Sequence, residues 1–175
     1  MGLAADLGYR HRPGNALQRR VAAFASSRPG AWLFARTLRH IDSVVLRLSR
    51  GRHSAPNLLA GLPVLDLTTT GRKSGQPRTS HLISVPIDDD LALLGTNFGQ
   101  PSTPAWVFNL EADPRASVSY RGRSVKVLAR SATADERARV IARSAGIYGG
   151  YQKYLKRISG REVRIFVLES VGRSD

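Results

Sequence analysis

Six short runs of β-forming residues between positions 62 and 170 constrain the fold of this chain more than any other feature. They lie at 62–70, 79–87, 91–96, 116–120, 124–130 and 161–170. Polar turns at Asp88–Asp90 and Arg121–Arg123 separate neighbouring runs, so two pairs of runs are expected to form hairpins. Mostly antiparallel strands with few helices between them indicate an α+β chain whose sheet closes, fully or partly, into a barrel.

Two helices are expected within this strand-rich region. The segment 104–112 carries Pro104 at its first turn, and the segment 133–146 opens with a capping box made by Thr133 and Glu136. Three tyrosines follow at spacings of three, and on a helix they would share a broad face. The consecutive glycines at 149 and 150 weigh against a helix there.

The first 60 residues differ from the rest in charge and in pattern. They contain ten arginines against two acidic residues, and helices are expected at 15–27 and 31–50. We therefore divide the chain into a basic helical extension, 1–60, and a barrel domain, 61–175. The second helix is basic and amphipathic, so it either packs on its own domain or lies on an anionic membrane surface.

Charge and composition bound the classes of function. The formal net charge is +14, which favours an anionic partner such as nucleic acid, anionic lipid or a phosphorylated small molecule. The chain has no cysteine, and its four histidines lack ligand spacing, so no metal site is expected. No apolar run is long enough to span a membrane and no signal peptide is apparent, which indicates a cytoplasmic protein.

The segment TTTGRKSGQPRTS at 68–80 follows an apolar run and concentrates three cations around two glycines. It is not a nucleotide P-loop, because Lys73 and Ser74 follow Arg72 rather than glycine. Gly71 and Gly75 would let backbone amides approach an anion, and the cations would offer donors to phosphate or carboxylate. The alternative is a solvated turn that happens to be basic.

LDLTTTGRKSGQPRTSHL, LLGTNFGQPSTPAWVFNLEADPRASV and YGGYQKYLKRISGREVRIFVLE together resemble the deazaflavin-dependent nitroreductase family, in which hydride is carried by coenzyme F-420. The resemblance runs from about residue 62 to residue 170 and implies a split β-barrel. It also implies a cofactor with a phosphate and a glutamate tail, and transfer of hydride to an activated double bond, a quinone or a nitro compound.

The resemblance implies a role for each matching position. The cofactor-binding residues would be Arg72, Lys73, Ser74, Arg78, Thr79, Ser80, His81, Leu82, Ile83, Leu94, Gly95, Thr96, Asn97, Ala105, Trp106, Val107, Phe108 and Asn109. Tyr148, Tyr151 and Tyr154 would line the substrate side. The hydroxyls of Thr96 and Tyr151 are the candidate catalytic groups, positioned to stabilise a developing oxyanion.

Other interpretations stay open at this point. Trp106 and Phe108 are equally typical of core packing, Asn109 of a residue that bridges a loop, and His81 of a surface residue. Phe98 and Ile83 depart from the family pattern on the substrate side, which weakens the expectation of nitro reduction more than that of cofactor binding. A flavin mononucleotide enzyme on the same barrel is the main alternative function. A basic membrane- or nucleic-acid-binding protein is a less favoured alternative, no specific nucleic-acid partner is expected, and a homodimer is possible.

Overall fold

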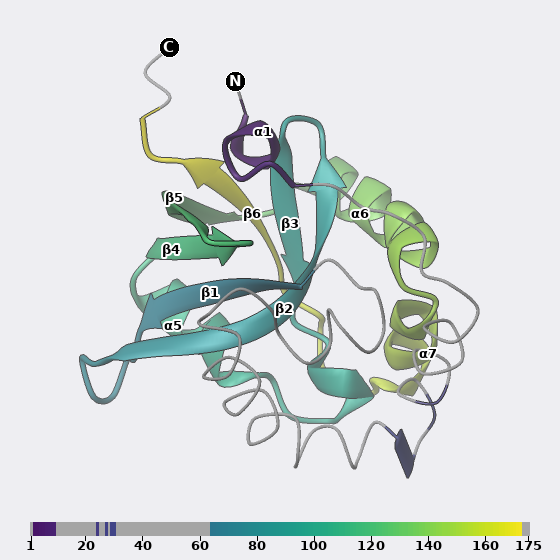
Figure 1. Ribbon diagram of the computed structural model, residues 1–175. Coiled ribbons are helices and arrows are strands. Elements are labelled where there is room, and N and C mark those ends of the chain that lie inside the picture. The colour runs from purple at the N-terminus through teal and green to yellow at the C-terminus, as the bar shows by residue number, and fades with distance from the viewer. Residues whose placement is uncertain (1, 10–23, 25–26, 28, 31–63, 173–175) are drawn as a thin grey trace.

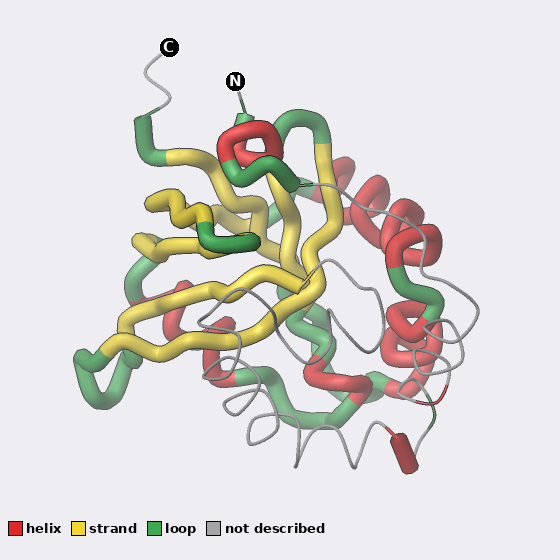
Figure 2. Tube along the Cα trace, viewed as in Figure 1, coloured by secondary structure: helices red, strands yellow, loops and turns green. Residues whose placement is uncertain are grey.

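The computed structural model describes residues 2–9, 24, 27, 29–30 and 64–172. Its centre is a closed six-stranded barrel in the order β1-β2-β3-β6-β5-β4, with every neighbouring pair antiparallel (Figures 1 and 2). The strands are β1 Val64–Thr70, β2 Pro77–Ile87, β3 Asp90–Leu94, β4 Arg115–Tyr120, β5 Arg123–Ser131 and β6 Ile165–Ser170. The predicted barrel of six antiparallel strands is therefore confirmed.

The helices lie outside or at the ends of the barrel. They are α1 Leu3–Asp6, the short 3-10 turn η1 Asn97–Gly99, α5 Ala105–Ala112, α6 Ala134–Ile147 and α7 Gly150–Arg157. Helices α5 and α6 match the predicted segments, although Pro104 caps α5 rather than lying in its first turn. Apart from residues 24 and 27, the helices predicted at 15–27 and 31–50 lie outside the described residues, as does the proposed boundary at residue 60.

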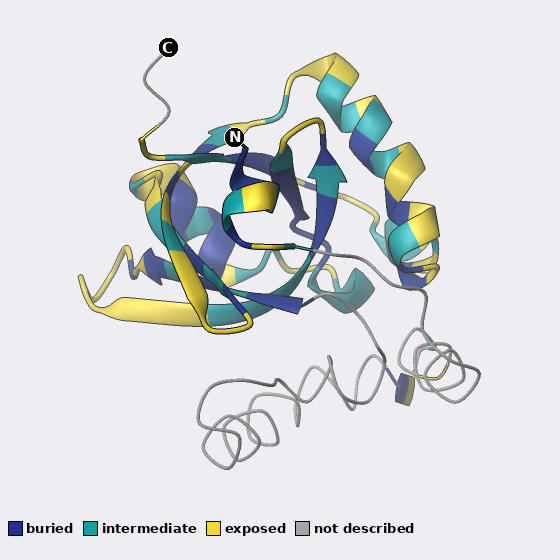
Figure 3. Cartoon of the chain, turned by 45° about the horizontal axis from the view of Figure 1, so that its top comes forward, coloured by how far each residue is buried: buried dark blue, intermediate teal, exposed yellow. Residues whose placement is uncertain are grey.

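Alternating residues of the strands fill the barrel interior, and two helices plug its ends. Trp106, Val107 and Leu110 of α5 join this core beside the β1–β2 turn. At the opposite end, α1 lies over the barrel opening and buries Leu3 and Leu7 almost completely (Figure 3). Because side chains occupy the interior and both ends, a cofactor of the expected size must bind outside the barrel.

A second core lies between the outer face of the barrel and the helix pair α6–α7. Val85, Ile87, Leu94 and Val167 point outward from the strands and pack against buried residues of the two helices. Helix α6 exposes one side to solvent and buries the other (Figure 3). Among the described residues, no helix is long and apolar enough to cross a membrane.

An ion-pair network joins α6 to the barrel through Arg130 of β5. Arg130 donates to both oxygens of Glu136 at 2.7 Å and, through Nε, to Glu169 at 2.6 Å. The Glu136 carboxylate also accepts a hydrogen bond from the backbone N–H of Thr133. In return, the Thr133 hydroxyl accepts one from the backbone N–H of Glu136, so the predicted capping box is present. The Arg130 guanidinium lowers the pKa of Glu136 to about 2, below its usual 4.5.

This lowered pKa predicts an acid-dependent loss of stability. Glu136 stabilises the fold above pH 4.5, and its contribution disappears as the pH falls from 4.5 towards 2, where the folded-state carboxyl takes up its proton. We expect Glu136→Gln to lower the free energy of unfolding by about 1–3 kcal/mol at neutral pH and by progressively less below pH 4.5. Urea unfolding at several pH values measures the difference. Glu111→Gln is the control, because the Glu111–Arg164 pair is half exposed and should contribute little. An unchanged difference at pH 2.5 would contradict the prediction.

Candidate functional site

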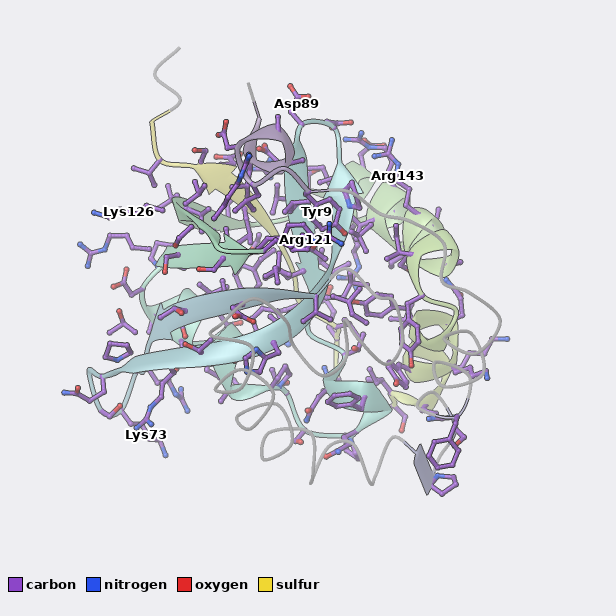
Figure 4. The ribbon with its side chains drawn as sticks, in the orientation of Figure 1. Tyr9, Lys73, Asp89, Arg121, Lys126 and Arg143 are labelled. Atoms are coloured by element: carbon purple, nitrogen blue, oxygen red, sulfur yellow. The ribbon has the colours of Figure 1, made fainter. Side chains whose placement is uncertain are left out.

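The basic turn between β1 and β2 projects from one end of the barrel. Lys73 lies at its tip, far from Asp89 at the opposite end (Figure 4). The turn is closed by the amide of Gly71, which donates to Gln76 O at 2.9 Å, and by that of Gly75, which donates to Gly71 O at 2.7 Å. Gly75 has φ +64°, which glycine adopts without strain, and a Cβ at Gly71 would lie 2.7 Å from Ser74 Oγ. Both glycines therefore serve the shape of the turn.

Helix α5 fixes the base of this turn through Asn109. The buried Asn109 side chain accepts from the Arg72 amide at 3.1 Å and donates to Thr69 Oγ1 at 3.0 Å. The Arg72 guanidinium lies over the Phe108 ring, 4.7 Å from its centroid. Asn109 thus bridges a loop, as one interpretation of the sequence had it, and Phe108 holds the Arg72 side chain in place.

The prediction that backbone amides of the turn approach an anion is wrong for most of them. The amides of residues 71, 72, 74, 75 and 76 all donate within the protein. Ser74 Oγ accepts from the Gln76 amide at 3.3 Å. Cationic side chains remain, because Arg72, Lys73 and Arg78 have no carboxylate partner in the described part of the chain. An anion at this turn would be held by side chains.

Strand β2 leads from the turn towards the helices, and its pleat separates the five predicted positions 79–83. Thr79, His81 and Ile83 point outward, whereas Leu82 packs against the barrel core and Ser80 pairs with the buried Leu67. Simultaneous contact of all five side chains with one ligand is therefore ruled out. On the outer face, Thr79 Oγ1 lies 3.0 Å from Thr68 Oγ1, and His81 Nδ1 lies 2.6 Å from Asp66 Oδ1.

The loop after β3 has a strained backbone. Asn97, Phe98 and Gly99 have φ values of +47°, +56° and +78° in succession. The two non-glycine residues cost about 1–2 kcal/mol each in this conformation. Asn97 Nδ2 donates to Ser102 O and Oγ at 3.0 Å, and the Phe98 ring lies edge-on to Tyr154 with centroids 6.2 Å apart. Strain of this kind gathers at functional sites, where the surroundings hold it.

The three predicted substrate-side tyrosines form one buried cluster against this loop. Helix α7 forms despite its glycines because Tyr151 and Tyr154 pack on the barrel, with Tyr148 just before them. The Tyr148 and Tyr154 hydroxyls are 3.0 Å apart, and Tyr151 donates to Ile83 O at 2.7 Å. Burial raises the pKa of Tyr151 and of Tyr154 well above the ordinary value.

These contacts separate the two candidate catalytic hydroxyls. The only phenolic proton of Tyr151 is already donated to Ile83 O inside the core, so this group is not placed to donate to a substrate. The Thr96 hydroxyl makes no hydrogen bond to any described residue, although Thr96 is only 5% exposed. Geometry thus favours Thr96 over Tyr151 as a donor to a bound molecule.

The remaining predicted residues divide between core and surface. Leu94 packs under α7, Trp106 and Val107 plug the barrel, and Ala105 begins α5. Gly95 approaches Val107 so closely that a Cβ would lie 2.9 Å from it. Helix α5 therefore joins the two halves of the site, since it contacts both the basic turn and the loop at 95–100.

Two residues in this region were not anticipated from the sequence. Arg161 donates to three carbonyls of the loop at 95–100, and Tyr9 donates to Ser84 O at 3.0 Å beside the Tyr120 ring. Burial raises the pKa of Tyr9 to about 12. Both contacts join segments more than 60 residues apart, so no local pattern could have indicated them.

The protein is thus a small antiparallel β-barrel. Its candidate site consists of a cationic turn, a strained loop and a tyrosine cluster on the outside of the barrel. Residues 38–170 match the F420H(2)-dependent quinone reductase family. The chain belongs to this family, which confirms the resemblance to F-420-dependent enzymes.

Individual relatives are consistent with this assignment. A curated F420H(2)-dependent quinone reductase of Mycobacterium tuberculosis is 32% identical over 87 residues, which are 46% of this chain and 58% of that protein. The chain therefore spans little more than half the length of this curated relative. The solved F420-H2 dependent reductase FDR-A has 30% identity and a TM-score of 0.56, over 61% of this chain and 94% of that one. A domain-swapped dimer has 27% identity and a TM-score of 0.58, over 81% and 99%.

Proposed function

We propose that this protein is an oxidoreductase that uses reduced coenzyme F-420 to reduce a quinone. The observation that carries the proposal is the cationic turn, which lies within the segment that matches the family and offers three side chains without carboxylate partners. A cofactor with an anionic tail suits a surface that carries these cations.

In this proposal, Arg72, Lys73 and Arg78 bind the phosphate and the glutamate tail. Ile83 lies four residues beyond Thr79 on the outer face of β2, about 14 Å along the strand from the end of the basic turn, beside the tyrosine cluster. The outward side chains of Thr79 and His81 line the path between them. A cofactor extended along this path would bring its ring near the loop that carries Thr96 and Asn97.

The chain itself binds and orients the cofactor and the acceptor, and it excludes water from them. The cofactor, when bound, supplies the hydride. The Thr96 hydroxyl donates a hydrogen bond to the oxygen that gains charge in the acceptor, and the buried tyrosines and Phe98 shield that region from water. Tyr151 has a positioning role, because its bond to Ile83 O holds β2 against α7.

Some finer expectations are part of the proposal. Quinones are the preferred acceptors, with activated double bonds next and nitro compounds last. We place the protein in the cytoplasm, with peripheral contact to anionic membrane through the arginine-rich residues 1–60, which vesicle sedimentation tests. A homodimer draws support from the domain-swapped relative.

Turnover with reduced F-420 tests the proposal directly. Purified protein is mixed with reduced cofactor and a soluble benzoquinone or naphthoquinone, and oxidation of the cofactor is followed by its absorbance. Quinone-dependent oxidation above the rate without protein is expected. If neither quinones nor activated double bonds nor nitro compounds oxidise the cofactor faster than in buffer, the proposed activity is wrong.

Two conservative substitutions separate the roles of the candidate hydroxyls. We expect Thr96→Val to lower kcat about 10-fold to 100-fold with little loss of stability, because it removes a hydroxyl that bonds no described residue. Tyr151→Phe should lower the free energy of unfolding by about 1–3 kcal/mol, because it leaves Ile83 O without its partner, and should change kcat less. Steady-state kinetics and urea unfolding of both variants measure these effects. The reverse pattern would restore Tyr151 as the catalytic group.

A further inference from the structure

Arg161 lies in the segment between α7 and β6, and its guanidinium donates hydrogen bonds to three backbone carbonyls of the loop after β3. Nη1 donates to Gly95 O at 3.0 Å, and Nη2 donates to Thr96 O at 3.2 Å and to Gln100 O at 3.1 Å. Three carbonyls that converge on one point would repel one another without a donor between them. A planar guanidinium with several fixed donors suits this arrangement.

The loop needs such a constraint because its backbone is strained between two of these contacts. The backbone of Asn97 and of Phe98 lies in the left-handed region. Gly99 is so close to Tyr154 that a Cβ added to Gly99 would lie 3.1 Å from the Tyr154 Cα. The bonds from Arg161 fall before this run, at Gly95 and Thr96, and after it, at Gln100. Arg161 therefore ties together the two ends of the strained stretch.

Arg161 holds this place without a charge partner. It forms no ion pair with a carboxylate of the described chain, whereas Arg164 on the same segment pairs with Glu111 at 3.3 Å. Burial and the nearby Arg164 lower the pKa of the Arg161 guanidinium from its ordinary value. Within the described chain, the charged donors of Arg161 therefore serve the carbonyls of this one loop rather than an ion pair.

We infer that Arg161 is a positioning residue for the proposed reaction: it holds the loop at 95–100 in the conformation that presents the Thr96 hydroxyl to the bound cofactor and acceptor. This role rests on the proposed function. Arg161 acts through Thr96 and touches neither reactant itself. A small displacement of Thr96 would then lower the rate of the chemical step more than it lowers binding of the acceptor.

Three variants of the full chain test this role. Arg161→Gln removes the charge and the fork, and Arg161→Lys keeps the charge but not the planar donors. Arg164→Gln is the matched control, because it removes one positive charge from the same segment while leaving the loop carbonyls bonded. Circular dichroism first establishes the temperature at which all three variants are folded, and every other measurement is made below it.

The first readout needs no cofactor. Amide hydrogen exchange of the unliganded protein should rise in the peptide covering residues 95–104 of Arg161→Gln, relative to wild type and to Arg164→Gln. The Gly99 and Gln100 amides, which donate to Thr96 O and Asn97 O, should lose protection. Unchanged exchange in this peptide would overturn the structural part of the inference, whatever the enzyme does.

The second readout compares kcat with KM for the quinone and adds the affinity for coenzyme F-420, measured by tryptophan fluorescence. In Arg161→Gln we expect kcat to fall by about 10-fold to 100-fold with KM changed by less than about 3-fold, and Arg161→Lys to recover part of the loss. Faster exchange with unchanged kcat and cofactor affinity would reduce Arg161 to a purely structural residue. If the wild-type protein fails to bind F-420, the proposed function fails, and the positioning role falls with it even where exchange shows that Arg161 orders the loop.

Discussion

Replacing both Arg72 and Lys73 with glutamine is expected to weaken the binding of coenzyme F-420 by about 100-fold or more. A hydrogen bond to a charged group contributes about 1.5–3 kcal/mol, and each 1.4 kcal/mol corresponds to a factor of ten in affinity. Neither cation pairs with a carboxylate of the described residues, so the free protein should lose little stability. A glutamine at position 72 keeps part of the side chain that packs over the Phe108 ring in the wild-type protein.

The control for this experiment is a double variant with the same loss of charge elsewhere. Arg121 and Lys126 are exposed cations on β5 and its preceding turn, well away from Lys73 (Figure 4). Arg121→Gln/Lys126→Gln should weaken binding only through the long-range field, by about 3-fold or less at physiological salt. Equal weakening by the two double variants would show that overall charge, rather than this turn, attracts the cofactor.

Truncation of Leu3 to alanine is expected to lower the free energy of unfolding by about 2–5 kcal/mol. Helix α1 has only four residues, yet Leu3 and Leu7 are buried in the same core as the barrel strands. The Ala4 amide donates to Asp89 O at 3.1 Å, which seats the helix on the β2–β3 turn. The side chain therefore fills the end of the barrel and cannot be removed without leaving a cavity.

Leu128→Ala provides the comparison, because this leucine is 44% exposed on the outer face of β5. Its truncation should cost less than about 1 kcal/mol, since little apolar surface is uncovered. Urea unfolding of both variants gives the difference. If the two truncations cost the same, α1 is not part of the cooperative unit of the barrel.

The barrel was predictable because its signals are local. Polar turns and β-rich runs defined the hairpins, and Thr133 with Glu136 marked the start of α6. Helix α1 was not predictable, because four residues carry no helical periodicity and the helix exists through Leu3 and Leu7 packing on a distant core. In α7, burial of Tyr151 and Tyr154 outweighs the low helix propensity of the glycines.

At the site, residue types were more predictable than their orientations. The three cations of the basic turn could be identified from sequence, but closure of that turn by its own amides could not. The family resemblance assigned all of 79–83 to the cofactor, whereas the pleat turns Leu82 into the core. Arg161 acts on carbonyls more than 60 residues earlier in the chain, a pairing that only the folded structure brings together.

The most direct test of the central claim is titration of the wild-type protein with oxidised and reduced coenzyme F-420, with flavin mononucleotide in parallel. The fluorescence of Trp106 reports binding, because α5 contacts both the basic turn and the loop at 95–100. Saturable binding of F-420, lost in Arg72→Gln/Lys73→Gln and retained in Arg121→Gln/Lys126→Gln, is the predicted result. Binding of flavin mononucleotide alone, or of neither molecule, would contradict it.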